Sequence, residues 1–119
     1  MWQWSRKRKS EQIGIAREMM DRVLAKYQIL EEYMESLGEN PDRGDIGKEL
    51  DKTNDVLEEI EYYGLLIKDD ELQESEIVKH DRTRTYFIWR KMKFKGIDIL
   101  KRMKNADLEK VNKRRIKRH

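Results

Sequence analysis

A row of apolar residues across the first third of the chain constrains its fold more than any other feature. From Ile13 to Leu37, these residues recur at alternating steps of three and four. Because that spacing returns to the same side of a helix, it predicts one long α-helix with a continuous apolar seam. Ser10 is a suitable N-cap, and Gly38 followed by Pro41 predicts that the helix ends at a left-handed glycine. The seam consists of Ile13, Ala16, Met20, Val23, Tyr27, Leu30, Met34 and Leu37.

This seam must be covered by another apolar surface. We expect a homodimer formed through the helix spanning Ile13 to Leu37, in the manner of a coiled coil. The alternative is that the seam packs into the core of its own chain. Met19, Leu24 and Ile29 widen the apolar face beyond a strict seam, which favours some packing within the domain.

Length and composition place the chain among small folded domains. The sequence has 119 residues, enough for one domain with a modest core. It contains no cysteine, so a disulfide framework and a thiolate metal site are excluded, and we expect a cytoplasmic protein. Its longest uncharged run, Tyr62 to Ile67, is far shorter than the roughly 18 residues that cross a bilayer. The beginning of the chain also lacks the apolar stretch of a signal peptide.

Charge is distributed very unevenly along the chain. Residues 1–9 carry four basic and no acidic side chains, residues 10–81 have a balance of −13, and residues 82–119 have a balance of +12. A block of one sign creates a local field that attracts the opposite charge. The last third therefore predicts a polyanionic partner. The alternative is that the basic residues pair with the acidic middle of their own chain.

A second helical segment begins near Asp45. Apolar residues lie on one face of this segment, but the polar run from Asp51 to Asn54 interrupts their spacing. Such residues cap helices well, so we interpret the run as a turn between two short helices. One continuous helix with a polar stretch is the alternative. Gly64 ends the segment. The next three residues, Leu65, Leu66 and Ile67, are apolar enough to enter the core.

Several stretches together resemble the winged helix-turn-helix of transcription regulators. Asp45 to Leu50, the polar turn, and Leu57 to Leu66 match its two helices, with a leucine-glutamate pair, then glycine and two apolar residues. Arg82 to Trp89 gathers β-branched and aromatic residues that favour a strand. Gly96 precedes an apolar row that resembles the C-terminal helix of many such regulators: Ile97, Ile99, Leu100 and Met103.

The resemblance covers roughly residues 28–105 and implies a mainly α fold with a small β-hairpin wing. We therefore expect a basic N-terminal arm at residues 1–9, a winged-helix-like domain at residues 10–105 with a long N-terminal helix and a C-terminal helix, and a basic C-terminal helix or arm at residues 106–119. The competing fold is an all-α helical bundle, because Tyr86 to Met92 is also compatible with helix.

The function that this resemblance implies is a small transcription regulator that binds duplex DNA. The start of the second short helix would approach bases or phosphates, two nearby basic residues would contact the backbone, and the wing and the C-terminal arm would add phosphate contacts. Acidic residues such as Glu58 and Glu59 would be repelled by phosphates. The candidate DNA-binding residues are Lys52, Thr53 and Asn54; Arg43 and Lys48; Arg82 and Arg84; and Lys113, Arg114 and Arg115.

The alternative function is a helical protein-interaction module, and one version of this alternative associates with a membrane surface. Trp2 and Trp4 stand directly before the basic run Arg6 to Lys9, which is typical of a membrane-surface anchor. We prefer the interpretation that these tryptophans pack on the domain, and we expect no membrane partner.

Catalysis has no support in the sequence. His80 and His119 do not form a spaced metal pair, and no phosphate-binding glycine loop is present. We expect neither an enzyme nor a small-molecule substrate, and no metal or cofactor.

Overall fold

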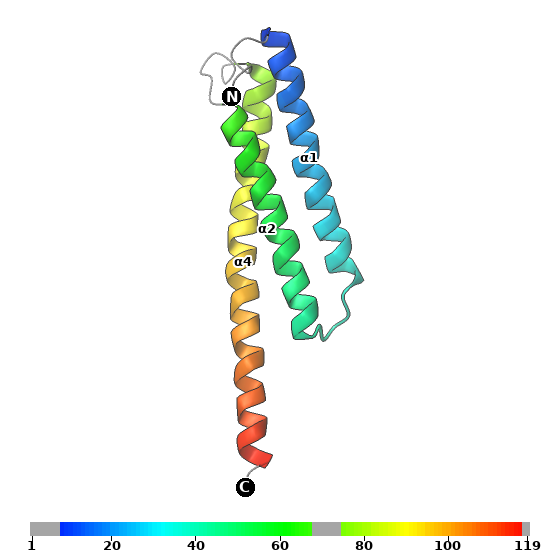
Figure 1. Ribbon diagram of the computed structural model, residues 1–119, viewed down its shortest axis with the longest axis vertical. Helices are drawn as coiled ribbons and strands as arrows, with labels where there is room; N and C mark the ends of the chain where they lie inside the picture. The colour runs from blue at the N-terminus through cyan, green and yellow to red at the C-terminus, as the bar shows by residue number, and fades with distance from the viewer. Residues whose placement is uncertain (1–7, 68–74, 118–119) are drawn as a thin grey trace.

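The protein is a bundle of three α-helices that run up, down and up again. The computed structural model describes residues 8–67 and 75–117, with side chains as far as residue 114 at the C-terminal end. The helices are α1 (Lys9–Ser36), α2 (Arg43–Leu66) and α4 (Glu76–Lys117). They pack side by side, and the C-terminal end of α4 continues well past the ends of α1 and α2 (Figure 1).

No strand is present among the described residues, so the predicted β-hairpin wing is wrong and the all-α bundle is the observed fold. The proposed wing strand from Arg82 to Trp89 lies inside α4, and Gly96 does not start a helix but lies in its middle. Tertiary packing makes this segment helical, because the burial of one side of a helix outweighs the local preference of these residues for a strand. That face follows steps of three and four through Val78, Asp81, Thr85, Ile88, Met92, Lys95 and Ile99.

Helix α2 is continuous through the predicted turn. Thr53 is fully buried, and its hydroxyl donates a hydrogen bond to the backbone carbonyl of Glu49 one turn earlier. The polar residue therefore satisfies its hydroxyl within the helix and does not end it. The beginning of α2 is fixed by a capping box, in which the side chains of Asp42 and Asp45 each accept a backbone N–H from the other residue. The prediction of two short helices is wrong.

The end of α1 agrees with the prediction in position but not in mechanism. The helix stops at Ser36, and the backbone N–H of Leu37 donates to the carbonyl of Met34. Gly38 was expected to adopt a left-handed conformation, but no glycine among the described residues has a positive φ. Gly64 likewise lies within α2 and does not end it. The chain leaves α1 in an extended conformation toward Pro41.

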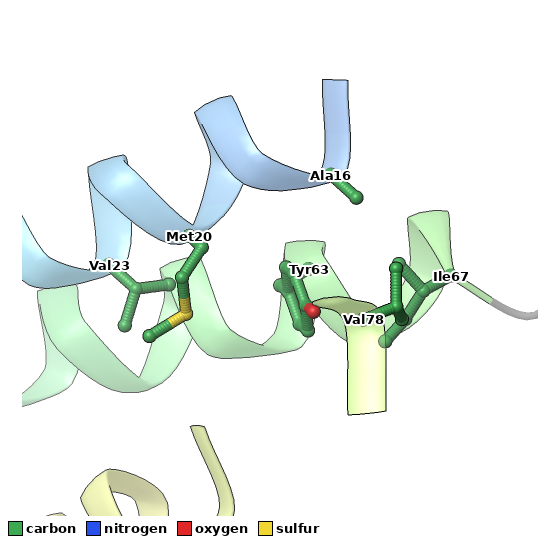
Figure 2. Packing of buried hydrophobic residues seen from close by; sticks show 6 residues of the cluster. All are labelled: Ala16, Met20, Val23, Tyr63, Ile67 and Val78. Atoms are coloured by element: carbon green, nitrogen blue, oxygen red, sulfur yellow. The ribbon is translucent and has the colours of Figure 1, made fainter. Parts of the chain in front are cut away.

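The apolar seam of α1 is covered by the other two helices of the same chain except at Met34, which is 40% exposed. One cluster of buried side chains joins all three helices near the beginning of α1 (Figure 2). A second cluster brings Leu30, Val56 and Met92 together halfway along the bundle. The seam therefore forms the chain's own core, as the alternative interpretation had it, while the homodimer stays a prediction. The first cluster consists of Ala16, Met20, Val23, Tyr63, Ile67 and Val78.

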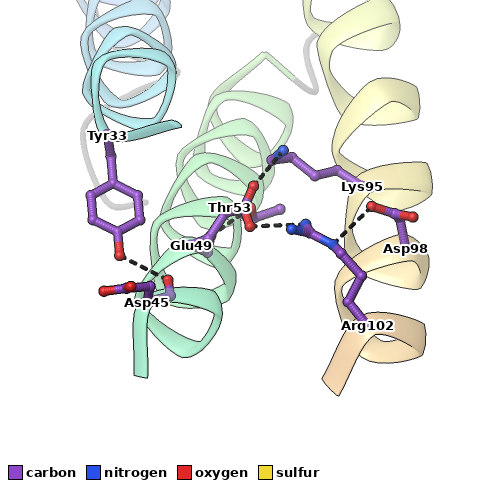
Figure 3. Close-up of polar contacts among 7 residues, drawn as sticks. All are labelled: Tyr33, Asp45, Glu49, Thr53, Lys95, Asp98 and Arg102. Atoms are coloured by element: carbon purple, nitrogen blue, oxygen red, sulfur yellow. Dashed lines mark hydrogen bonds and ion pairs between the residues drawn. The ribbon is translucent and has the colours of Figure 1, made fainter. Parts of the chain in front are cut away.

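A buried carboxylate fixes how α4 is rotated against α2. Glu49 is 2% exposed, and its two oxygens lie 2.9 Å from Lys95 Nζ and 2.9 Å from Arg102 Nη2 (Figure 3). Asp98 forms an ion pair with Arg102 from the next turn of α4. Near the start of α2, Arg43 pairs with Asp107. These contacts turn one side of α4 inward and leave its opposite side to the solvent.

Candidate polyanion-binding surface

The side of α4 that points away from the bundle carries large apolar side chains and lysines in one row. We call this row the outer face. Its six apolar members are each between 41% and 57% exposed, which is unusual for such residues in a small bundle. The outer face consists of Tyr86, Trp89, Lys93, Ile97, Leu100, Lys104, Leu108 and Val111.

The outer face repeats every eleven residues. The triplet Tyr86, Trp89 and Lys93 is followed eleven residues later by Ile97, Leu100 and Lys104, and then by Leu108 and Val111. Eleven residues are close to three full turns of an α-helix, so each repeat returns to nearly the same side, with a drift of about 20°. The inner side of α4 follows the different, seven-residue spacing of a helix packed in a bundle. The outer face is therefore a second pattern on the same helix.

Aromatic rings form a patch at the first repeat. Tyr86 stacks on Trp89 with 6.3 Å between ring centroids, and Phe87 meets Tyr86 edge to face at 5.7 Å. The ammonium of Lys93 lies over the ring of Trp89, 5.7 Å from its centroid. Arg90 lies in the same way over Phe94, at 5.9 Å. The cations stay close to the apolar surface while their charged groups face the solvent.

The three helices differ in net charge. By sequence, α4 carries 15 basic and 5 acidic residues, a balance of +10, whereas α1 has a balance of −2 and α2 a balance of −4. No Asp or Glu belongs to the outer face. On α2, by contrast, the acidic residues Glu58 and Glu61 surround a shallow hollow with Tyr62 and Leu65. The molecule therefore presents a basic helix on one side and acidic helices on the other.

The pKa values of Lys91 and Tyr63 are both raised by their surroundings. Lys91 donates a hydrogen bond to the hydroxyl of Tyr27, and this bond raises the pKa of Lys91 above its ordinary value. The Tyr63 hydroxyl is buried, and this burial, with a smaller effect from Asp81, raises the pKa of Tyr63 to about 12. Neither group offers an acid or base that titrates near neutral pH. Within the described ranges, no three His, Asp or Glu residues cluster as a metal site would require.

The structure places the DNA-binding residues predicted on α2 in different environments. Thr53 is fully buried, and Lys52 lies over the ring of Tyr33, 5.3 Å from its centroid. Arg43 pairs with Asp107 at 2.8 Å. The two other members of this set, Lys48 and Asn54, are exposed.

The predicted residues on α4 lie at its two ends. Arg82 and Arg84 are exposed near the beginning of the helix, and Lys113 and Arg114 are exposed near its end. Helical rise separates these pairs by about 45 Å, so the structure does not bring them together. The side chain of Arg115 lies outside the described part of the chain. So do residues 1–7, which include Trp2 and Trp4.

The sequence interpretation did not recognise the outer face as one surface, because it assigned the residues of this face to two different elements. Tyr86 and Trp89 were interpreted as a wing strand, and Ile97 and Leu100 as the packing face of a C-terminal helix. In the structure Ile97 and Leu100 are exposed, and only Ile99 between them is buried. The eleven-residue repeat was the signal in the sequence that identifies this surface.

No protein-family model, curated protein or solved structure matches the chain. Among the described helices, none has an apolar stretch of the length that a membrane span needs. The function is therefore argued from the geometry and charge of the outer face.

Proposed function

We propose that this protein is a helical binding module for polyanions and that the outer face of α4 is its binding surface. The observation that carries this proposal is the separation of charge between α4, with its balance of +10, and the acidic helices α1 and α2. The outer face itself contains Lys93 and Lys104 and no carboxylate, and Glu61 of α2 lines a pocket beside Lys93. A one-signed surface of this kind attracts and orients an extended partner of opposite charge.

The lysines of the outer face are available to such a partner. Two cations of α4, Lys95 and Arg102, form ion pairs with Glu49 in the core. Lys93 and Lys104 are exposed, and in the described part of the chain neither forms an ion pair. Glu61 of α2 lines the same pocket as Trp89 and Lys93, but it forms no ion pair with Lys93 in the described structure. The sequence left open that the basic residues pair with acidic residues of their own chain. Such pairing is found for the inner cations Lys95 and Arg102, but not for Lys93 and Lys104.

Retention of the full chain on immobilised heparin, used as the polyanion, tests this proposal. The double variant Lys93→Gln/Lys104→Gln removes two charges from the outer face. Its matched control, Arg17→Gln/Lys48→Gln, removes two exposed charges from α1 and α2. We expect the first variant to elute at clearly lower salt than the control, because polyanion affinity depends on the cations that contact it. Equal elution of the two variants would show that only net charge matters and would reject the outer face as the site.

A further inference from the structure

We infer that the polyanion is the surface of an anionic phospholipid bilayer, on which α4 lies flat with its outer face toward the lipid. This inference rests on the proposed function and specifies the partner. It is carried by the chemistry of the outer face, in which six of the eight positions are large and apolar. A surface of this composition needs a partner that offers both negative charge and hydrocarbon.

The aliphatic members of the outer face select lipid over other polyanions. Ile97, Leu100 and Leu108 are 54%, 57% and 51% exposed and have no hydrogen-bonding atoms in their side chains. A nucleic acid or a polysaccharide presents mainly charged and polar groups along its backbone, which leave such side chains in water. The boundary between lipid headgroups and acyl chains buries them, and each buried methylene strengthens the association.

The shape of the row fits a plane. From Tyr86 to Val111 the outer face extends for about 38 Å, and its two eleven-residue steps drift together by only about 40° around the helix. The apolar side chains therefore stay within one stripe that a flat surface can cover from end to end. Beyond Asp107, which pairs with the beginning of α2, the helix extends past the bundle, so its last turns are accessible from all sides (Figure 1).

The polar and aromatic members are placed as an interfacial helix requires. Tyr86 and Trp89 have apolar rings with one polar atom each, and such side chains concentrate at the level of lipid headgroups. Lys93 and Lys104 stand within the apolar row, and their long side chains allow the ammonium groups to reach phosphates while the methylenes stay in the apolar layer. Helix α2 flanks the first repeat of the outer face, where Leu57, Ile60 and Glu61 line a pocket with Trp89 and Lys93.

A second copy of this chain is a poorer partner for the outer face. In a parallel pair of outer faces, Lys93 lies against Lys93 of the other copy. In an antiparallel pair centred between Ile97 and Leu100, Lys93 lies against Lys104. Like charges therefore meet in both arrangements, which weakens association.

Co-sedimentation of the full chain with lipid vesicles tests this inference. The vesicles consist of phosphatidylcholine with about 30% phosphatidylserine, and pure phosphatidylcholine vesicles are the uncharged reference. The test variant is Ile97→Gln/Leu100→Gln, which changes no charge. The matched control is Ile29→Gln/Leu65→Gln, which removes one isoleucine and one leucine of similar exposure, 47% and 45%, from α1 and α2. Circular dichroism confirms that both variants fold.

We expect wild type and control to bind the anionic vesicles and to bind the uncharged ones much more weakly. The Ile97→Gln/Leu100→Gln variant should bind anionic vesicles at least about tenfold more weakly, because two side chains no longer enter the acyl layer. Its retention on heparin should be unchanged.

Three outcomes would overturn the inference. Equal vesicle affinity of the two double variants would show that apolar insertion at the outer face plays no part. Retention on heparin, or binding to duplex DNA, without any vesicle binding would reject the bilayer but leave the proposed function standing. Failure to bind heparin, DNA and vesicles alike would remove the proposed function as well.

Discussion

Glu49 and Lys95 form an ion pair in the interior of the bundle, with 2.9 Å between Oε1 and Nζ and with side chains that are only 3% and 14% exposed. The second oxygen of Glu49 pairs with Arg102. One desolvated carboxylate of α2 thus binds two cations that lie two turns apart on α4. Because these two cations point inward, the outer face points to the solvent.

Removal of this carboxylate should destabilise the bundle strongly. Glu49→Ala leaves Lys95 and Arg102 as partly buried cations without their partner, and we expect a loss of about 3 kcal/mol in the free energy of unfolding. Glu58→Ala, at an exposed position of α2, is the control and should change it by less than about 0.5 kcal/mol. Urea denaturation followed by circular dichroism measures both. Similar effects of the two changes would contradict the observed core network.

The Tyr63 hydroxyl should make stability decrease at high pH. Its pKa is raised to about 12 from the ordinary value of 10.0, mainly by burial and also by Asp81. The folded state therefore holds this proton more tightly than the unfolded state does. The contribution is fully present below about pH 10 and is lost as pH rises toward about 12, by about 2 to 3 kcal/mol in total.

The variant Tyr63→Phe isolates this effect from the titration of the other tyrosines. In the described structure the Tyr63 hydroxyl is buried without a hydrogen-bond partner, so its removal should be tolerated at neutral pH. Between pH 9 and 12, chemical denaturation should show a smaller loss of stability for Tyr63→Phe than for wild type. Parallel pH curves would mean that Tyr63 ionises in the folded protein as it does in water.

The continuity of α2 is testable at Asn54. In a turn between two short helices a proline is often accommodated, but inside a helix it removes a hydrogen bond and clashes with the preceding turn. We expect Asn54→Pro to cost about 3 kcal/mol or more, measured by thermal unfolding. The exposed neighbour Asp55→Ala serves as the control and should be nearly neutral. Tolerance of the proline would restore the helix-turn-helix interpretation of this segment.

The adjacent residues Ile29 and Leu30 of α1 should contribute very differently to the stability of the fold. Leu30 is 1% exposed and packs with Val56 and Met92, whereas Ile29 is 47% exposed. Leu30→Ala should destabilise the chain by about 2 to 4 kcal/mol because it opens a cavity in the core. Ile29→Ala should cost less than about 0.5 kcal/mol. If both changes had the same small effect, the seam would not be part of the intrachain core.

The sequence predicted α1 and its seam because eight apolar residues there follow the helical period without interruption. It did not predict α4, since the inner face of that helix includes Asp81, Thr85 and Lys95 at positions where apolar residues were expected. The burial of Lys95 depends on a tertiary partner, Glu49, which no local pattern reveals, whereas the Thr85 hydroxyl donates to the carbonyl of Arg82 within α4.

The candidate site was only partly predictable for a related reason. The basic last third correctly indicated where positive charge gathers, but the aromatic run at Tyr86 and Trp89 has the composition of a strand as well as of a helix face. The outer face becomes visible only when α4 is known to be one helix, because its repeat extends over three segments that the sequence interpretation kept apart. The eleven-residue spacing then distinguishes this face from the inner one.

The most direct test of the account is the position of Trp89 relative to the lipid. The chain has three tryptophans, so the Trp2→Phe/Trp4→Phe variant leaves Trp89 as the single indole. With vesicles of phosphatidylcholine and phosphatidylserine whose acyl chains carry bromine, we predict a blue shift and quenching of Trp89 fluorescence. Bromines near the headgroup end should quench most, because an interfacial helix lies about 5 to 10 Å deep. Vesicles that bind the protein without changing or quenching this fluorescence would contradict the proposed contact of α4 with the bilayer.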